Sequence, residues 1–214
     1  MKLKGIIFDL DGTLGNTFPV IFPAFRYALE KIMGRSYSDQ ELTATFGPTE
    51  EGIFQRLAPD LWQECLQVYM EKYKQLSPMN TQRFPGIEQA LQALKQRKIL
   101  LAVVTGKSLT SALISLEDLG FSGYFDIVKG GSDAGSIKAA CMHEVLEIWN
   151  LPSQQVAYIG DVASDMHYAK EVGLIPLGAA WYEQVDYDSL KREHPQAVFR
   201  SVKDFICWIE SNHH

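Results

Sequence analysis

Residues 6–14 read IIFDLDGTL, an apolar run that ends in two carboxylates, Asp9 and Asp11. The apolar run is typical of a short strand buried on both faces, and the Gly-Thr that follows indicates a loop. Residues two apart in an extended segment point to the same side, so both carboxylates can face one substrate atom. Two like charges at this distance repel each other, which predicts that a cation lies beside them.

Buried strand patterns recur along the chain and alternate with helical patterns. Further apolar runs lie at residues 99–105, 154–161 and 173–181. Helical patterns occupy residues 86–98, 108–120, 136–150 and 163–173, and Gly120 and Gly173 stand where two of these helices should end. This alternation predicts an α/β fold whose core is a doubly wound, Rossmann-like parallel sheet.

One interval interrupts the alternation. Between residues 15 and 84 the sequence contains helical segments and no convincing strand, which is too long for a simple crossover. Extra helices on one face of the sheet would explain it, but an insertion directly after the carboxylate loop would lie over that loop, and we favour this explanation. The sequence therefore predicts a core domain of residues 1–14 and 85–214 and a smaller, all-helical cap domain of residues 15–84.

The overall composition narrows the class of protein. A net charge of −6 argues against general affinity for nucleic acid or anionic membranes, but leaves a small anion possible as ligand. Three widely spaced cysteines indicate a reduced, cytoplasmic protein. The apolar run after the basic N-terminus is too short for a secretory signal, and no run is long enough to span a bilayer. His213 and His214 are typical of an expression tag, and we assign them no function.

Polar residues follow three of the predicted strands, at the sheet edge where ligands of such folds bind. Besides the first pair of carboxylates there are Thr105 and Gly106 at the end of the run at residues 99–105, Asp161 and Asp165 at the end of the run at residues 154–161, and Lys138 at the start of a helix. A single Asp would more often be a helix cap or turn residue. Several together predict a hard divalent cation, and we expect Mg²⁺ because it binds oxygen ligands.

The same residues suggest a phosphoryl-transfer chemistry. One carboxylate of Asp9 and Asp11 can attack phosphorus while the other transfers protons. The Thr105 hydroxyl and the Lys138 ammonium are suited to the equatorial phosphoryl oxygens, where negative charge must be stabilised.

Four ordered motifs carry a family resemblance that spans nearly the whole chain. FDLDGTL from Phe8, VVTGKS from Val103, Lys138 and IGDVASD from Ile159 resemble the motifs of the haloacid dehalogenase superfamily, in its phosphoglycolate phosphatase-like branch with a helical cap. The resemblance implies that Asp9 is the nucleophile, that Asp11 is the general acid and then base, and that Thr105 and Lys138 bind the phosphoryl group. It also implies Mg²⁺ bound by Asp9, the Asp11 carbonyl and Asp161, with Asp165 as a ligand or as support for the ligands.

Two details of the motifs refine this expectation. The family's lysine is commonly followed by proline, whereas Ala139 follows Lys138, and Lys129 is a competing candidate. Relatives with dehalogenase activity lack an acid at the position of Asp11, so its presence favours phosphate esters.

Three further features bear on the substrate. The segment FGPTEEG, residues 46–52, resembles a substrate-facing cap loop of phosphoglycolate phosphatases and of a related inorganic pyrophosphatase group, which makes Thr49 and Glu50 candidate substrate contacts. A helix N-cap at Thr49 is an equally good interpretation. Gly106 and Lys107 are the other candidate substrate-binding residues. Lys107 resembles the lysine in the same motif of these phosphatases, whereas the related sugar-phosphate mutases tend to have a small hydroxylated residue there, so the resemblance favours hydrolysis over mutase chemistry. Aromatic residues from Phe18 onward are expected to pack inside the cap.

The sequence thus predicts a Mg²⁺-dependent phosphatase that hydrolyses a small phosphomonoester, such as phosphoglycolate or a sugar phosphate, through an aspartyl phosphate. A sugar-phosphate mutase of the β-phosphoglucomutase type, an inorganic pyrophosphatase and, more remotely, a non-catalytic binding module are the alternatives. We expect the protein to bind a small phosphorylated metabolite and to be a monomer or a homodimer. Residues 15–84 do not specify which metabolite it is.

Overall fold

A six-stranded sheet, parallel throughout, forms the centre of the protein in a computed structural model that describes residues 3–211. In spatial order its strands are β5 (Ile127–Lys129), β4 (Leu100–Val104), β1 (Gly5–Phe8), β6 (Val156–Gly160), β7 (Ile175–Ala179) and β8 (Ala197–Phe199). The predicted α/β fold is confirmed. His213 and His214 lie outside the described residues.

The four strands expected from apolar runs are the four central ones, β4, β1, β6 and β7. The two edge strands, β5 and β8, were not predicted. Each has three residues, and most of their side chains are only partly buried. A strand this short at a sheet edge carries too few apolar residues to give a recognisable pattern.

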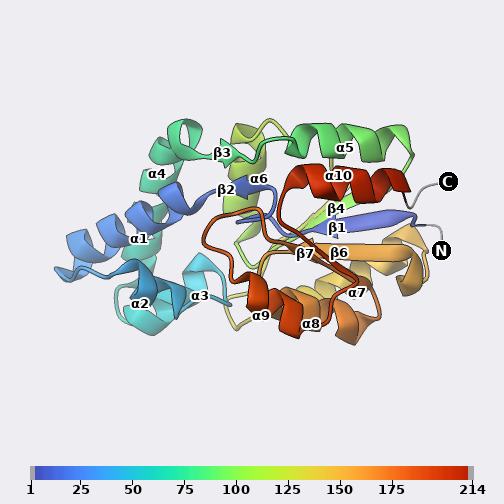
Figure 1. Ribbon diagram of the computed structural model, residues 1–214. Coiled ribbons are helices and arrows are strands. Elements are labelled where there is room, and N and C mark those ends of the chain that lie inside the picture. The colour runs from blue at the N-terminus through green and yellow to red at the C-terminus, as the bar shows by residue number, and fades with distance from the viewer. Residues whose placement is uncertain (1–2, 212–214) are drawn as a thin grey trace.

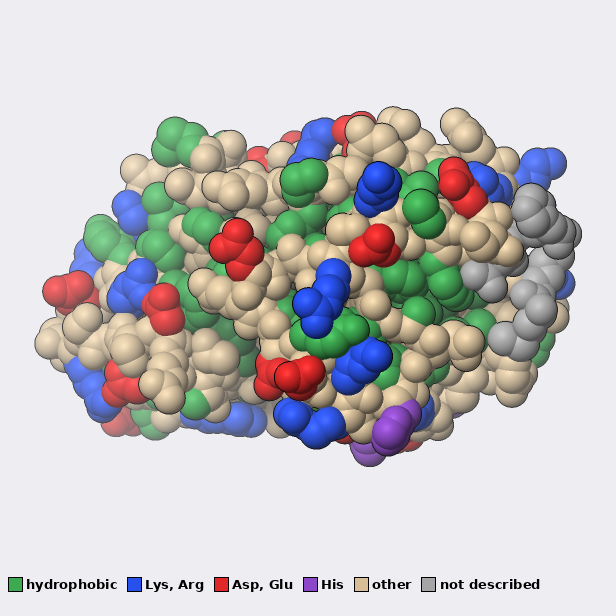
Figure 2. All heavy atoms as spheres, in the orientation of Figure 1, with side chains coloured by type: hydrophobic (Ala, Val, Ile, Leu, Met, Phe, Trp, Pro, Cys, Tyr) green, Lys and Arg blue, Asp and Glu red, His purple; other side chains and the backbone are tan. Residues whose placement is uncertain are grey.

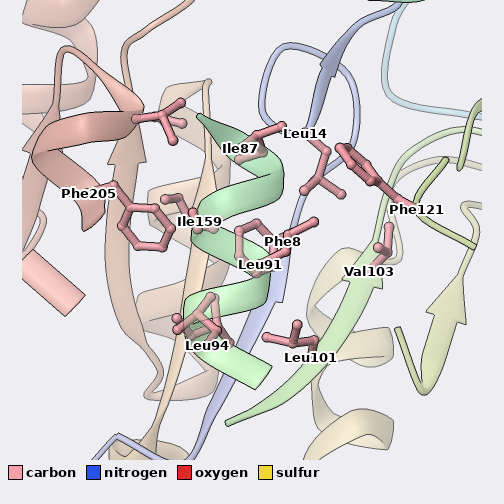
Figure 3. Packing of buried hydrophobic residues seen from close by; sticks show 14 of the residues in the cluster. Phe8, Leu14, Ile87, Leu91, Leu94, Leu101, Val103, Phe121, Ile159 and Phe205 are labelled. Atoms are coloured by element: carbon pink, nitrogen blue, oxygen red, sulfur yellow. The ribbon is translucent and has the colours of Figure 1, made fainter. Parts of the chain in front are cut away.

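Helices cover both faces of the sheet (Figure 1). The helices α5 (Ile87–Gln96), α6 (Leu109–Asp118) and α10 (Val202–Ser211) contribute to one apolar cluster, and α7 (Lys138–Trp149) and α8 (Ala163–Val172) contribute to the other. In Figure 3, Leu91 and Leu94 of α5 lie over the strands that carry Phe8 and Leu101, with Phe205 of α10 beside them. This packing fixes the strand ends that carry the polar residues. A short α9 (Tyr187–Arg192) and a 3₁₀ turn, η1 (Ser153–Gln155), complete this part.

Four helices form a separate body at one end of the molecule (Figure 1). They are α1 (Phe18–Met33), α2 (Asp39–Thr43), α3 (Glu50–Leu57) and α4 (Trp62–Asn80), and they enclose an apolar cluster of their own. Two short antiparallel strands, β2 (Gly15–Asn16) and β3 (Gln82–Arg83), join this body to the sheet. Each strand has two residues, which is too short for the sequence to have indicated them.

The surface and the cysteines agree with the composition. Figure 2 shows acidic and basic side chains interspersed on one face, with no continuous basic area on that face. Cys65, Cys141 and Cys207 are all free. Within residues 3–211, no helix is both long and apolar enough to cross a membrane.

Candidate active site

Polar side chains lie at the carboxyl ends of three neighbouring strands of the sheet. Asp9, Thr105 and Asp161 directly follow β1, β4 and β6, which lie side by side and run parallel. The three residues are buried, with exposed fractions of 6%, 2% and 7%. The strand ends lie together because the strands pair in parallel, with Phe8 at the end of β1 opposite Ile159 in β6.

Asp9 and Lys138 form the centre of this group. The Lys138 ammonium at the N-terminus of α7 lies 3.2 Å from Asp9 Oδ1 and 2.6 Å from Asp165 Oδ1. Asp9 Oδ1 is fully buried, and its contact with Lys138 lacks hydrogen-bond geometry, so the described residues leave it without a hydrogen-bond partner. Burial raises the pKa of Asp9 to about 7, although Lys138 opposes the rise.

The carboxylates have the donor chemistry of a site for a hard cation. Oxygen atoms of Asp9, Asp161 and Asp165 lie within 4.8 Å of one another, and all three residues are buried. Burial and the neighbouring carboxylates of Asp9 and Asp165 raise the pKa of Asp161 well above its ordinary value. A bound cation would relieve this repulsion and would give Asp9 Oδ1 a partner, so the donor set suits a divalent ion such as Mg²⁺.

Asp165 is held more firmly than Asp9. Its Oδ1 accepts hydrogen bonds from Lys138 and, at 3.3 Å, from the Tyr158 hydroxyl, and its Oδ2 accepts one from Val162 N at 3.4 Å. Asp165 therefore positions Lys138 as well as belonging to the acidic group.

Two glycines give these carboxylates room. Gly12 has φ of +77°, and a Cβ added there would lie 2.2 Å from Asp161 Oδ2. A Cβ on Gly160 would lie 2.2 Å from Asp165 Oδ2. Glycine is needed at both places because the backbone passes directly against a carboxylate. Gly12, in the Asp-Gly-Thr sequence, thus leaves the space that the Asp161 carboxylate occupies.

Asp11 belongs to a second group that borders the first. The Thr17 hydroxyl donates a hydrogen bond to Asp11 Oδ1, and Lys107 Nζ lies 3.5 Å from the same oxygen. Lys107 is buried and lies 4.8 Å from the centre of the Tyr73 ring. Burial disfavours its charge, but Asp11, Tyr73 and Glu50 raise the pKa of Lys107 above its ordinary value. No sequence pattern indicated that Thr17 contacts Asp11, since a Thr after a loop is common.

The two candidate lysines occupy different places. Lys138 lies between the carboxylates, whereas the Lys129 side chain pairs with Glu144 at 2.6 Å on the surface. The side chain of Lys138, and not that of Lys129, is therefore in reach of Asp9.

The start of α3 contacts α6 and the loop after β5, outside the helical body. Glu50 is buried and accepts hydrogen bonds from Ser108 N, at 2.9 Å, and from the Ser111 hydroxyl at the start of α6. Thr49 N donates to Ser132 O at 2.9 Å. Thr49 occupies the N-cap position of α3, but its side chain accepts no capping hydrogen bond, and it is not among the described residues that line the cavity below. Glu50 does line that cavity.

A cavity of about 490 Å³ lies between the carboxyl ends of the central strands and the helical body. Its sheet side is polar and includes Asp9, Asp11, Thr105, Gly106, Lys107, Lys138 and Asp161. Its helical side includes Phe18, Ile21, Phe25, Phe46, Ile53 and Tyr69. Phe18 and Phe25 were expected to pack inside the helical body, and both belong to its apolar packing. They also face the cavity, and helical periodicity cannot distinguish these two environments.

Comparison with known proteins agrees with this architecture. A phosphoglycolate phosphatase from Aquifex aeolicus is 28% identical to this chain over 98% of each sequence. A pyrophosphatase PpaX from Bacillus pumilus is 26% identical over 97% of this chain and 96% of that protein. The solved structure of a haloacid dehalogenase-like family hydrolase from Streptococcus pneumoniae superposes with a TM-score of 0.81 at 27% identity, covering 97% of this chain and 98% of that one.

The fold and the site together define an enzyme with a parallel α/β core, whose polar site residues lie at the carboxyl ends of the central strands. The family model described as "Haloacid dehalogenase-like hydrolase" matches residues 6–178, and the chain belongs to that family. Relatives that match nearly the whole chain are named as a phosphoglycolate phosphatase and a pyrophosphatase. This chain is a phosphate-ester hydrolase.

Proposed function

We propose that this enzyme is a Mg²⁺-dependent phosphatase that hydrolyses a small phosphomonoester through an aspartyl phosphate on Asp9. The observation that carries the proposal is the buried Asp9 carboxylate, which contacts Lys138 at 3.2 Å, belongs to an acidic group and faces the cavity. A nucleophile beside a fixed cation is suited to attack on a dianionic phosphate, because the cation offsets the repulsion between the two negative charges.

In the first half-reaction, an Asp9 oxygen bonds to phosphorus and the bond between phosphorus and the ester oxygen breaks. Asp11 donates its proton to that oxygen, so the alcohol leaves neutral. Thr105 and Lys138 stabilise the charge on the equatorial oxygens. Mg²⁺, held by Asp9, the Asp11 carbonyl and Asp161, would supply further neutralisation of phosphoryl charge, with Asp165 supporting these ligands.

In the second half-reaction, Asp11 accepts a proton from a water molecule whose oxygen bonds to phosphorus. The bond between phosphorus and Asp9 then breaks, which regenerates the carboxylate and releases inorganic phosphate. Thr17 and Lys107 both contact Asp11 Oδ1, and these contacts support a positioned rather than freely rotating acid-base group.

We further propose that residues 15–84 act as a cap on a core of residues 1–14 and 85–214. The hydrogen bonds from Ser108 and Ser111 to Glu50 join the two parts beside the cavity, and β2 and β3 form a narrow connection between them. Opening at this connection would admit substrate, and closure would exclude water. The free cysteines support a reduced, cytoplasmic setting.

Inorganic pyrophosphate is a second candidate substrate, favoured by the relative named pyrophosphatase PpaX and by the cation at Lys107 next to Asp11. It would use the same nucleophile, with phosphate as the leaving group.

The test is release of inorganic phosphate from a panel of phosphomonoesters and pyrophosphate, with Mg²⁺ or with EDTA. We expect release that needs the metal and falls below detection in Asp9→Asn. Comparable release in EDTA would contradict the metal requirement. Substantial release by pure Asp9→Asn protein would remove Asp9 as the nucleophile.

A further inference from the structure

The wall of the cavity opposite the phosphoryl site is mainly apolar, although Thr43 and Glu50 also line it. It is built by Phe18, Ile21 and Phe25 of α1, Phe46 of the loop before α3, Ile53 of α3 and Tyr69 of α4. Among the described residues of the helical body, no Lys or Arg lines the cavity. A leaving group that fills this space therefore meets carbon atoms on most of its surface.

The two lysines that line the cavity are already paired with carboxylates. Lys107 is paired with Asp11, and Lys138 is paired with Asp9 and Asp165. Glu50 accepts hydrogen bonds from the start of α6. A carboxylate or second phosphate on the leaving group would be buried next to Glu50 with no lysine or arginine of the cap wall to pair with, and burial of such a charge is costly.

One polar atom in this wall is unmatched. The Tyr69 side chain is fully buried and lines the cavity, and within residues 3–211 its hydroxyl has no hydrogen-bond partner. By contrast, the neighbouring Tyr73 hydroxyl is 2.7 Å from Ser115 Oγ. Buried hydroxyls are nearly always hydrogen-bonded, so the missing partner of Tyr69 points to an acceptor on the ligand.

We propose that the substrate is a phosphomonoester of an uncharged, largely apolar alcohol of about the size of an aromatic ring, carrying one hydrogen-bond acceptor for Tyr69. A cavity of about 490 Å³ accommodates such a ring together with the phosphoryl group. This inference rests on the proposed phosphatase function and disfavours phosphoglycolate, hexose phosphates and pyrophosphate as the best substrates.

The experiment compares kcat/KM for benzyl phosphate, 2-phosphoglycolate and pyrophosphate with Mg²⁺ present. We expect benzyl phosphate to exceed both others by about tenfold or more, because burial of a ring in an apolar pocket contributes at least that factor. A higher value for phosphoglycolate or pyrophosphate would overturn this inference and leave the phosphatase function intact. No release from any of the three would overturn both.

Substitutions test whether the apolar wall sets the preference. Phe46 is 38% exposed, so Phe46→Lys should fold while placing a cation at the wall. We expect the ratio of kcat/KM for benzyl phosphate to that for phosphoglycolate to fall by about tenfold. Met33→Lys is the matched control, with 36% exposure at the far end of α1 and outside the cavity lining, and should keep the wild-type ratio. An unchanged ratio in Phe46→Lys would overturn the assignment of the wall.

The acceptor is tested with the three isomers of pyridylmethyl phosphate, whose ring nitrogen can accept a hydrogen bond. We expect the wild type to prefer one isomer over benzyl phosphate and Tyr69→Phe to lose that preference, with little change for benzyl phosphate. Tyr37→Phe, a buried cap tyrosine outside the cavity lining, is the control. Retention of the preference in Tyr69→Phe would remove Tyr69 from substrate recognition.

Discussion

Replacing Asp9 with asparagine should stabilise the metal-free protein at pH 8. Burial raises the pKa of Asp9 from 3.8 to about 7, against the opposing effect of Lys138. An unfolded Asp9 ionises near its ordinary pKa, so ionised Asp9 costs the folded protein free energy. The amide of Asp9→Asn carries no charge and removes that cost. Lys138 keeps its ion pair with Asp165 at 2.6 Å, so the substitution does not leave it unpaired.

The magnitude follows from the shift in pKa. Each pKa unit corresponds to about 1.4 kcal/mol, so a rise from 3.8 to about 7 gives roughly 4 kcal/mol as an upper bound at pH 8. Relaxation of the loop and entry of water reduce this, and we expect a gain of about 1–4 kcal/mol. The cost of ionised Asp9 grows as pH rises from about 4 to 7. The advantage of Asp9→Asn should therefore shrink by more than half between pH 8 and pH 5.

Thermal unfolding in EDTA, followed by circular dichroism at both pH values, measures this difference. For a chain of 214 residues, each kcal/mol corresponds to about 2–4 °C in Tm. Asp60→Asn, which changes an exposed carboxylate, should leave Tm unchanged. Added Mg²⁺ should raise the Tm of the wild type more than that of Asp9→Asn, because Asp9 belongs to the acidic group. A Tm of Asp9→Asn equal to or below that of the wild type at pH 8 in EDTA would refute the reasoning.

Two further substitutions have matched controls. Gly12→Ala and Gly34→Ala both place alanine at positive φ, +77° and +66°, but only at Gly12 does the new Cβ meet a carboxylate oxygen, at 2.2 Å. We expect urea unfolding to show about 1 kcal/mol lost at Gly34 and at least 1 kcal/mol more at Gly12, and equal losses would show that the contact with Asp161 is easily relieved. Lys138→Met should lower kcat by about 10²-fold or more, because Lys138 contacts Asp9, the proposed nucleophile, whereas Lys129→Met should change kcat less than about twofold. A comparable loss in both variants would contradict the assignment of Lys138.

The sequence by itself determined the central strands of the core and the polar residues at their carboxyl ends. The central strands β1, β4, β6 and β7 were predictable because a strand buried on both faces needs a nearly continuous apolar run. The polar residues were predictable because a carboxylate directly after such a run lies at the strand's carboxyl end. These patterns are local, and each is set by a few consecutive residues.

Only the tertiary structure decided which groups contact one another. It brought Lys138 to Asp9 and Asp165 and left Lys129 with Glu144. It also turned Phe18 and Phe25 toward the cavity. Periodicity shows that a side chain is buried but not what it is buried against, since that depends on how the helical body of residues 18–80 closes over the sheet. The cavity lies at this junction, and the residues that line it are far apart in the chain.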